Sequence, residues 1–245
     1  MSGARTPVLI LSALGMLGAG SAGLDTVRLD RLEEADVGDA HPPGWQVRSV
    51  RGVEPPHSEV VEETGHPELD RALRFEAEGQ AAFFWLELSE SIEPAREKVR
   101  WYWKVEDPVD GAHLREPERD DAPARFFVVF GTGGVFSTPE ILFYTWGGAA
   151  EDVGTHWTYP DEDNFRIMVT RNADDPLDTW LRESRDLHED YRRTFGGDPE
   201  AVTAVGFMID TDDTGARAAS RLGAIAKTLK RSPAPGAPIP DAGAR

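Results

Sequence analysis

The chain has 245 residues, of which 40% are hydrophobic, with a formal net charge of −18 and no cysteine. This length allows one large domain with its own core, and the charge argues against nucleic acid or an anionic membrane surface as a partner, because both would repel it. Without cysteine the chain forms no disulfides and has no thiol to carry a lipid anchor.

The amino terminus has the three parts of an export signal. Arg5 supplies a positive charge, residues 7–20 form an apolar stretch, and residues 20–22, Gly-Ser-Ala, form a small-residue cleavage site. The stretch is shorter than the roughly 20 residues that span a bilayer. We therefore predict a cleaved signal peptide over residues 1–22, a periplasmic or secreted location, and no stable membrane insertion after cleavage.

The remaining sequence predicts one strand-rich domain between two less regular segments. Residues 23–44 mix charges, glycine and proline and are expected to form an irregular lead-in, whereas residues 231–245, rich in proline, alanine and glycine, are expected to be a disordered tail. Between them, runs of β-branched and aromatic residues separated by glycine and proline are typical of strands joined by turns. In a single domain over residues 45–230 we expect strands at residues 45–50, 59–64, 69–77, 81–88, 99–105, 125–130, 141–146, 165–170, 177–183 and 202–209.

Three of these runs indicate how the strands face the core. Residues 81–88 and 125–130 are apolar on both faces, as central strands are. Residues 99–105 alternate, with Trp101 and Trp103 on one face and Tyr102 on the other. Two tryptophans on one face can stack on a sugar, but side chains of this size more often fill a core. We therefore expect Tyr102 to be the better candidate for contact with a ligand.

The segment Asp186 to Phe195 interrupts the strand pattern. Within it Leu187 and Tyr191 precede Phe195 at intervals of four residues, and Gly196 follows as a C-cap does. This spacing predicts one short helix whose apolar stripe docks on a sheet.

The loop of residues 156–160, HWTYP, contains Trp157 and Tyr159, whose size no core periodicity explains. Exposed aromatic side chains on a loop are the strongest indication of a ligand platform in this sequence. The alternative is that both side chains cover one end of the core.

The strand over residues 202–209 is followed by Asp210, Asp212 and Thr214 at alternate positions. Oxygen ligands at this spacing resemble the first half of a calcium loop. The second half is missing, because Arg221 stands where an EF-hand has its bidentate glutamate.

A structural calcium site at this strand end would need a further carboxylate, from Asp120 or Asp121 on a neighbouring loop. The ligand set that we predict for calcium therefore consists of Asp121, Asp210, Asp212 and Thr214. The alternative is a turn whose carboxylates accept backbone N–H bonds or pair with Arg125.

Five motifs follow one another along the domain. They are Trp101-x-Trp103, Asp120-Asp121-x-x-x-Arg125, Tyr144-x-Trp146, Asp190-Tyr191-Arg192-x-x-Phe195-Gly196 and DTDDTG at residues 210–215. In this order they resemble a bacterial exported family known as domain of unknown function 3047, over roughly residues 45–229. The resemblance implies an all-β fold, a jelly-roll or concanavalin-like β-sandwich of the kind shared by lectins and carbohydrate-binding modules. It implies no activity, because the family has none assigned.

The sequence departs from the family pattern in two places. Asp213 stands where the family favours asparagine, and residues 222–225, LGAI, stand where it has Tyr-Gly-Asp-Ile. The lost carboxylate weakens any site that used it. By periodicity alone, residues 216–229 fit an amphipathic helix, but we favour a strand, because propensity is a weak guide and Gly223 disfavours a helix interior.

The leading hypothesis is an exported, non-catalytic β-sandwich protein that binds a glycan or another cell-envelope ligand. Its candidate ligand-binding residues are Tyr102, Arg125, Tyr144, Trp146, Trp157 and Tyr159. Calcium is the cofactor that the sequence suggests, and the oligomeric state is left open.

Two alternatives belong to other functional classes. The first is a carbohydrate-active enzyme, a hydrolase or lyase, that uses Asp121 and Asp210 as an acid/base pair. The Glu-x-Asp-x-x-Glu pattern of common sandwich glycosidases does not occur in the sequence. The second is a structural or assembly component of the cell envelope.

Overall fold

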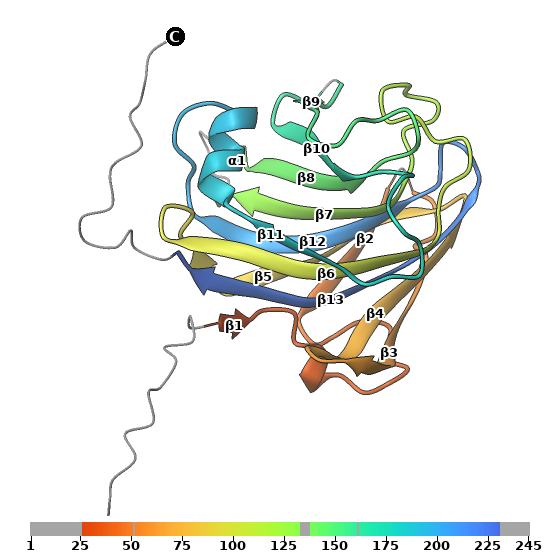
Figure 1. Cartoon of the computed structure of the whole chain (residues 1–245), viewed down its shortest axis with the longest axis horizontal. Coiled ribbons are helices and arrows are strands. Elements are labelled where there is room, and N and C mark those ends of the chain that lie inside the picture. Colours follow the sequence, from red (N-terminus) through yellow and green to blue (C-terminus); the bar gives the residue numbers. More distant parts are fainter. Residues whose placement is uncertain (1–25, 51, 133–137, 161, 231–245) are drawn as a thin grey trace, which may run out of the picture.

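The computed structural model describes residues 26–50, 52–132, 138–160 and 162–230. Two β-sheets pack face to face, and the helix α1 (Leu187–Thr194) lies against one side of them (Figure 1). The predicted signal peptide and the predicted tail lie outside the described residues. Within the described part of the chain, no helix has the length and apolar character that crossing a membrane requires.

Strands make up most of the described chain. In order, the elements before α1 are β1 (Thr26–Arg28), a 3-10 turn (Leu32–Glu34), β2 (Trp45–Ser49), β3 (His57–His66), β4 (Leu69–Glu78), β5 (Ala81–Ile92), β6 (Glu97–Asp107), β7 (Ala122–Phe130), β8 (Glu140–Trp146), β9 (His156–Thr158), β10 (Phe165–Arg171) and β11 (Leu181–Arg185). After α1 come β12 (Val202–Asp210) and β13 (Arg217–Leu229).

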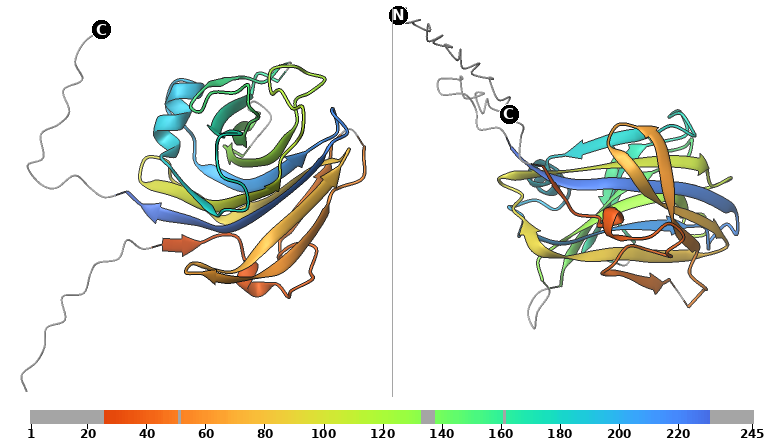
Figure 2. Two further views of the ribbon diagram at one scale, coloured as in Figure 1. Left: turned by 45° about the vertical axis from the view of Figure 1, so that its right-hand side comes forward. Right: turned by 90° about the horizontal axis from the view of Figure 1, so that it is seen from below.

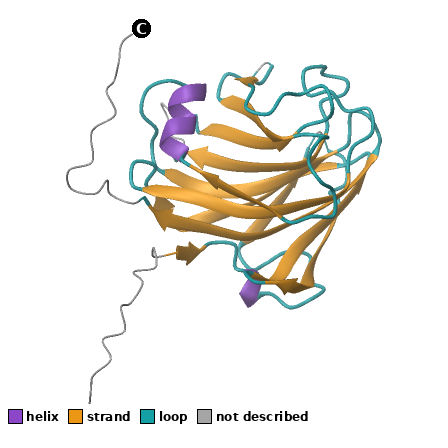
Figure 3. Ribbon diagram, viewed as in Figure 1, coloured by secondary structure: helices purple, strands orange, loops and turns teal. Residues whose placement is uncertain are grey.

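The strands form a six-stranded and a seven-stranded sheet. The six-stranded sheet has the order β11-β6-β13-β4-β3, with β1 paired to β13, and the seven-stranded sheet has the order β2-β5-β12-β7-β8-β10-β9. Among the described strands, β8 and β10 are parallel and the other pairs are antiparallel. The seven-stranded sheet curls round at its β8 to β10 side (Figure 2). The predicted jelly-roll-like β-sandwich with a short helix is thereby confirmed (Figure 3).

The core between the sheets contains the predicted tryptophan face. Trp101 and Trp103 on β6 are fully buried, and the ring of Trp101 stacks on Phe126 of β7 with the centroids 4.0 Å apart. Burial of a large apolar side chain contributes roughly 1.5–3 kcal/mol. Because β6 and β7 belong to different sheets, this contact holds the two layers together.

The structure corrects three expected segments. The lead-in is not wholly irregular, because Thr26–Arg28 pairs with β13 and so joins the six-stranded sheet. Residues 156–158 are not a loop but form the edge strand β9, which pairs with β10. The strand expected from residue 177 begins at Leu181, because Asp178 adopts a left-handed conformation with φ of 52° that interrupts extended backbone.

The ambiguous residues 216–229 form the strand β13, between β6 and β4. Ala224 has a φ of 50°, and the register with β6 shifts between Gly223 and Ala226. This irregularity has the features of a β-bulge, which breaks the alternation of side chains and explains why the hydrophobic pattern drifts toward a helical period. The predicted short helix is confirmed as α1, with Asp186 as its N-cap.

Gly206 lies in the middle of β12, with β5 on one side and β7 on the other. A Cβ atom at this position would overlap the ring of Phe127 and the carbonyl oxygen of Phe84. We expect Gly206→Ala to lower the free energy of unfolding by about 3 kcal/mol, because a backbone oxygen cannot rotate away as a side chain can.

Chemical denaturation measures this loss, and Gly215→Ala is the control. A Cβ atom at Gly215 would meet nothing within 4 Å, so the expected loss is the strain of a positive φ alone, about 1 kcal/mol. Equal losses in the two variants would show that the close approach at Gly206 has no effect on stability.

Candidate functional site

The seven-stranded sheet has a second apolar surface on the face turned away from the core. Phe83, Phe127 and Phe143, from β5, β7 and β8, form its centre, with ring centroids 5.7, 6.3 and 5.6 Å apart. The strands β5 and β7 are apolar on both faces because one face fills the core and the other forms this surface. An apolar sheet face outside the core is a candidate region for binding a ligand or partner.

Two adjoining cavities hollow this surface, and together we call them the groove. The larger has a volume of about 610 Å³, the smaller one of about 260 Å³, and Phe83 and Phe165 border both. The apolar end, in the larger cavity, includes Trp85, Phe127, Val129 and Ile141. The polar end, in the smaller cavity, includes Arg125, Tyr159, Asp210, Asp212 and Asp213.

Arg125 is the buried cation of the polar end, with 2% of its surface exposed. Its Nη2 donates to the carboxylate of Asp120 at 2.7 Å and to the carbonyl oxygen of the same residue at 2.8 Å. The same nitrogen lies 3.7 Å from Oδ2 of Asp210. The pairing of Arg125 with a carboxylate of the Asp210 turn, which the sequence offered as an alternative, is therefore found for Asp210.

Asp121 holds the turn between β12 and β13. Its Oδ2 accepts from the backbone N–H of Thr214 at 2.7 Å and from the Thr214 hydroxyl at 2.5 Å, while its Oδ1 accepts from the N–H of Asp213 at 3.2 Å. The Thr214 hydroxyl also accepts from the N–H of Ala216 at 3.2 Å. Thr214 therefore positions Asp121. The role of Thr214 as a calcium ligand stays a prediction, because a hydroxyl oxygen that accepts one hydrogen bond has a second lone pair.

Asp210 and Asp212 face Asp121 across this turn. One carboxylate oxygen of each of the three lies within 4.8 Å of the others, so the predicted meeting of Asp121 with Asp210 occurs. Burial, and then the neighbouring carboxylates of Asp212 and Asp121, hold the pKa of Asp210 well above its usual value, against the opposing effect of Arg125. Asp210 is therefore a group that needs a proton or a cation beside it.

Tyr159 borders the polar end of the groove, as a ligand-binding role requires. Burial, and then the carboxylate of Asp120, raise the pKa of Tyr159 to about 12. Its hydroxyl therefore stays neutral at physiological pH and donates a hydrogen bond to Asp120.

The other predicted ligand residues lie elsewhere. Tyr144 and Trp146 are 0% and 1% exposed, so their prediction as ligand contacts is wrong: both side chains point into the core between the sheets. Tyr102 is on the six-stranded sheet, packed edge-on against His66 with ring centroids 4.8 Å apart. It belongs to a different face of the molecule from the groove.

Trp157 is partly exposed on β9, but the guanidinium of Arg115 lies 4.2 Å from the centre of its ring. Its side chain packs against the apolar cluster that contains Phe127 and Phe143, and against a smaller buried cluster that contains Leu114 and Val169. One ring face is thus occupied within the protein, and Trp157 is not among the residues that border the groove.

The Asp-Tyr-Arg motif on α1 anchors the helix. Arg185 donates to both oxygens of Asp190, at 2.6 and 2.8 Å, and the Tyr144 hydroxyl donates to Oδ2 of Asp190 at 2.9 Å. Tyr191 donates to the carboxylate of Glu140 at the start of β8. The motif therefore supports the fold, and it contributes no residue to the groove.

Sequence reasoning missed Phe83, Trp85 and Phe165, which border the groove. The signal that predicts Phe83 and Trp85 is the run at residues 81–88, which is apolar on both faces. A strand with one face in the core and the other in solvent alternates apolar and polar residues. A strand that is apolar on both faces is therefore either buried on both faces or exposes one of them to a ligand.

The fold and the groove together define a jelly-roll-like β-sandwich protein with a ligand-sized hollow on one sheet. The model of the family described as "Protein of unknown function (DUF3047)" matches residues 43–226, so the chain belongs to that family. No curated protein matches the sequence.

Several solved structures have a similar architecture. The family 11 carbohydrate-binding module from Clostridium thermocellum, in complex with a β-1,3-1,4-mixed-linked tetrasaccharide, is 9% identical with a TM-score of 0.47, over 84% of this chain and 97% of that chain. A Stig cyclase, Fisc, from Fischerella sp. TAU is 10% identical with a TM-score of 0.43, over 85% and 100%. The CBM22-1 xylan-binding domain of Xyn10C from Paenibacillus barcinonensis is 15% identical with a TM-score of 0.37, over 81% and 97%. These similarities concern the architecture alone.

Proposed function

We propose that the protein is an exported, non-catalytic binding protein that holds a glycan of the cell envelope in the groove. The observation that carries the proposal is an apolar, aromatic cavity beside a polar one on the same sheet face, with Phe83 and Phe165 bordering both. Its larger cavity, about 610 Å³, has the size of a small-molecule binding site.

A glycan matches both ends of the groove. Trp85 and Phe165 are partly buried, so part of each ring is accessible to the apolar C–H face of a sugar. At the polar end, Tyr159 and Asp212 are partly exposed and can hydrogen-bond to sugar hydroxyls.

The aspartate pair favours binding over hydrolysis. Asp121 is 0% exposed and accepts three hydrogen bonds from the β12–β13 turn. It is not among the residues that border the groove, although Asp210 is. A hydrolase needs both carboxylates at the scissile bond, so we propose a binding role for this site.

Export is proposed from residues 1–22, which lie outside the described residues. Expression of the full sequence in a bacterial host, followed by mass spectrometry of the periplasmic fraction, tests it. We expect a chain that begins after Ala22. A full-length chain in the cytoplasm would contradict export without bearing on the groove.

The binding proposal predicts that Trp85→Ala weakens the affinity for a glycan about 30-fold, the loss of roughly 2 kcal/mol that an aromatic anchor contributes. A glycan array identifies the ligand, and titration followed by calorimetry measures the affinity. Trp180→Ala is the matched control, because Trp180 is also partly buried but packs near Tyr102 on the opposite sheet. We expect it to bind as the unchanged protein does.

Equal affinities of the two variants would contradict a ligand in the groove. An array without any bound glycan would contradict the glycan assignment. In that case the alternative of a structural or assembly component of the cell envelope would gain support if the unchanged chain captured an envelope protein and Trp85→Ala did not.

A further inference from the structure

Three carboxylates meet where the polar end of the groove joins the β12–β13 turn. They come from segments far apart in sequence: Asp121 precedes β7, Asp210 ends β12, and Asp212 follows it. One oxygen of each lies within 4.8 Å of the others. We infer that Asp121, Asp210 and Asp212 bind one divalent cation, and that calcium is the ion that fits them.

The buried oxygen of Asp210 points to a missing partner. The Asp210 side chain is 8% exposed, and its Oδ2 lies 3.7 Å from Nη2 of Arg125. Its Oδ1 is buried and receives no hydrogen bond from a donor among the described residues. The side chain within hydrogen-bond reach of Asp210, that of Asp212, is also a carboxyl group and has no proton to donate when it is ionised. Buried polar atoms are nearly always satisfied in native proteins, because an unsatisfied one destabilises the fold. A cation between the carboxylates satisfies this oxygen.

The donor set selects a hard divalent cation. Carboxylate oxygens are hard donors, which calcium and magnesium prefer and zinc does not require. The three oxygens come from the end of β12, the turn after it and the loop before β7, and all lie within 4.8 Å of one another. Calcium accepts such irregular sets of oxygens, whereas magnesium requires a near-ideal octahedron, so calcium is the ion that we expect.

The coordination sphere can be completed without displacing existing bonds. Oδ1 of Asp121 accepts one hydrogen bond, from the N–H of Asp213, and a carboxylate oxygen has two lone pairs. Asp212 is partly exposed and borders the smaller cavity, so water from the groove reaches the ion. Calcium accepts six to eight oxygen ligands and commonly includes water among them.

The ion would tie the loop before β7 to the turn after β12, which Asp121 already joins through hydrogen bonds. The inference does not rest on the proposed function, because it concerns the cation alone. A failure of the protein to bind a glycan would not bear on the cation site.

Calorimetric titration with calcium chloride tests the inference, after treatment of the protein with EDTA and dialysis. We expect one saturable site with calcium and weaker binding with magnesium. At a calcium concentration about 100 times the Kd, the Tm is expected to rise by roughly 5–11 °C, because the ion binds the folded chain alone.

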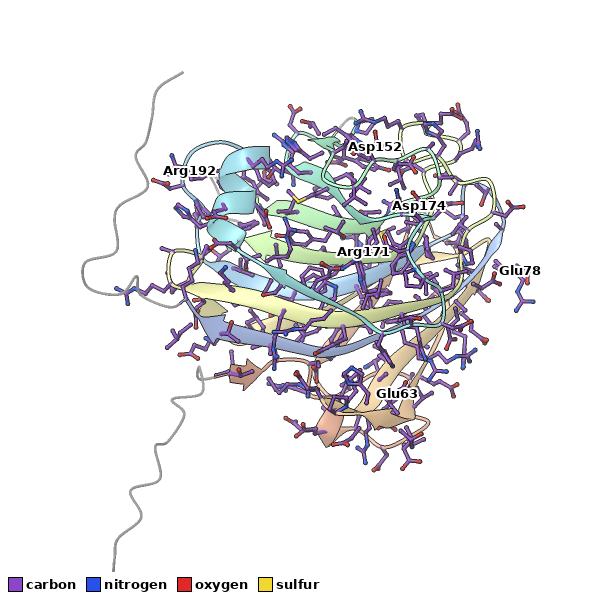
Figure 4. The ribbon with its side chains drawn as sticks, in the orientation of Figure 1. Glu63, Glu78, Asp152, Arg171, Asp174 and Arg192 are labelled. Carbon is purple, nitrogen blue, oxygen red and sulfur yellow. The ribbon has the colours of Figure 1, made fainter. Side chains whose placement is uncertain are left out.

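Asp210→Asn and Asp212→Asn are expected to abolish the saturable heat and the rise in Tm. Asp174→Asn is the matched control: it removes the same charge from an exposed loop between β10 and β11 (Figure 4) and should respond as the unchanged protein does. If Asp210→Asn does not fold, the Asp212→Asn variant, whose substitution lies on the partly exposed turn, tests the cation site by itself. An unchanged protein without saturable binding, or an Asp212→Asn variant that retains it, would overturn the inference. An Asp210→Asn variant as stable as the unchanged protein, with no response of either to calcium, would assign a shared proton to the cluster instead.

Discussion

Replacement of Asp190 with alanine is expected to lower the free energy of unfolding by about 3–5 kcal/mol, because it removes the acceptor of a buried network. The substitution leaves the guanidinium of Arg185 and the fully buried hydroxyl of Tyr144 without the carboxylate to which both donate. It also releases α1 from the sheet. Urea denaturation measures the loss, which corresponds to a fall in Tm of roughly 6–20 °C for a chain of this size.

Asp198→Ala is the control for this substitution. The Asp198 side chain is 80% exposed and lies 3.4 Å from His188 and 3.8 Å from Arg192. Exposed pairs contribute about 0–1 kcal/mol, so we expect little change. Losses of similar size at Asp190 and Asp198 would show that the family motif does not anchor the helix.

Arg125→Ala is expected to lower the free energy of unfolding by about 3–5 kcal/mol at pH 7, because it leaves buried carboxylates without their counter-charge. Asp120, 6% exposed, loses two hydrogen bonds, and Asp210 loses the guanidinium at 3.7 Å. Denaturation in EDTA, with any bound cation removed, measures this loss. Arg217→Ala is the control, since Arg217 is 69% exposed and lies 3.9 Å from Glu78.

The effect of Arg125→Ala is expected to depend on pH. The pKa of Asp210 is already raised in the folded chain, and removal of Arg125 raises it further. A carboxyl with a raised folded pKa contributes stability that is present below its unfolded pKa of about 3.9 and is lost as the pH rises through the folded value. The loss in Arg125→Ala should therefore shrink as the pH is lowered from 7 toward 5. A loss that is independent of pH would contradict uncompensated charge as its cause, and Arg217→Ala should show no such dependence.

The fold was largely predictable because its signals are local. The alternation around Trp101 and Trp103, the four-residue spacing from Leu187 to Phe195 and the glycine and proline turns are each set by a few neighbouring residues. The errors fall where a single backbone conformation intervenes. The positive φ of Asp178 delays β11, and the irregularity at Ala224 gives a strand the hydrophobic period of a helix.

The candidate site was predictable in part. The sequence places Asp210 and Asp212 at a strand end, and the meeting of that end with Asp121 was expected and is found. Tyr144 and Trp146 were placed on the wrong surface, because an aromatic residue in a strand has the same local pattern whether its face meets a core or a ligand. Trp85 was missed for the same reason.

Composition, periodicity and motif order by themselves determined that this is an acidic, cysteine-free, all-β protein with one short helix and an aspartate-rich strand end. These properties depend on residues close together in the chain. Only the tertiary structure decided which face of β5 and β7 is core and which is groove, and that Thr214 serves Asp121. The physical reason is that faces and carboxylate neighbours are set by strands that pair across long sequence separations, such as Asp121 with Thr214, where the sequence contains no local signal.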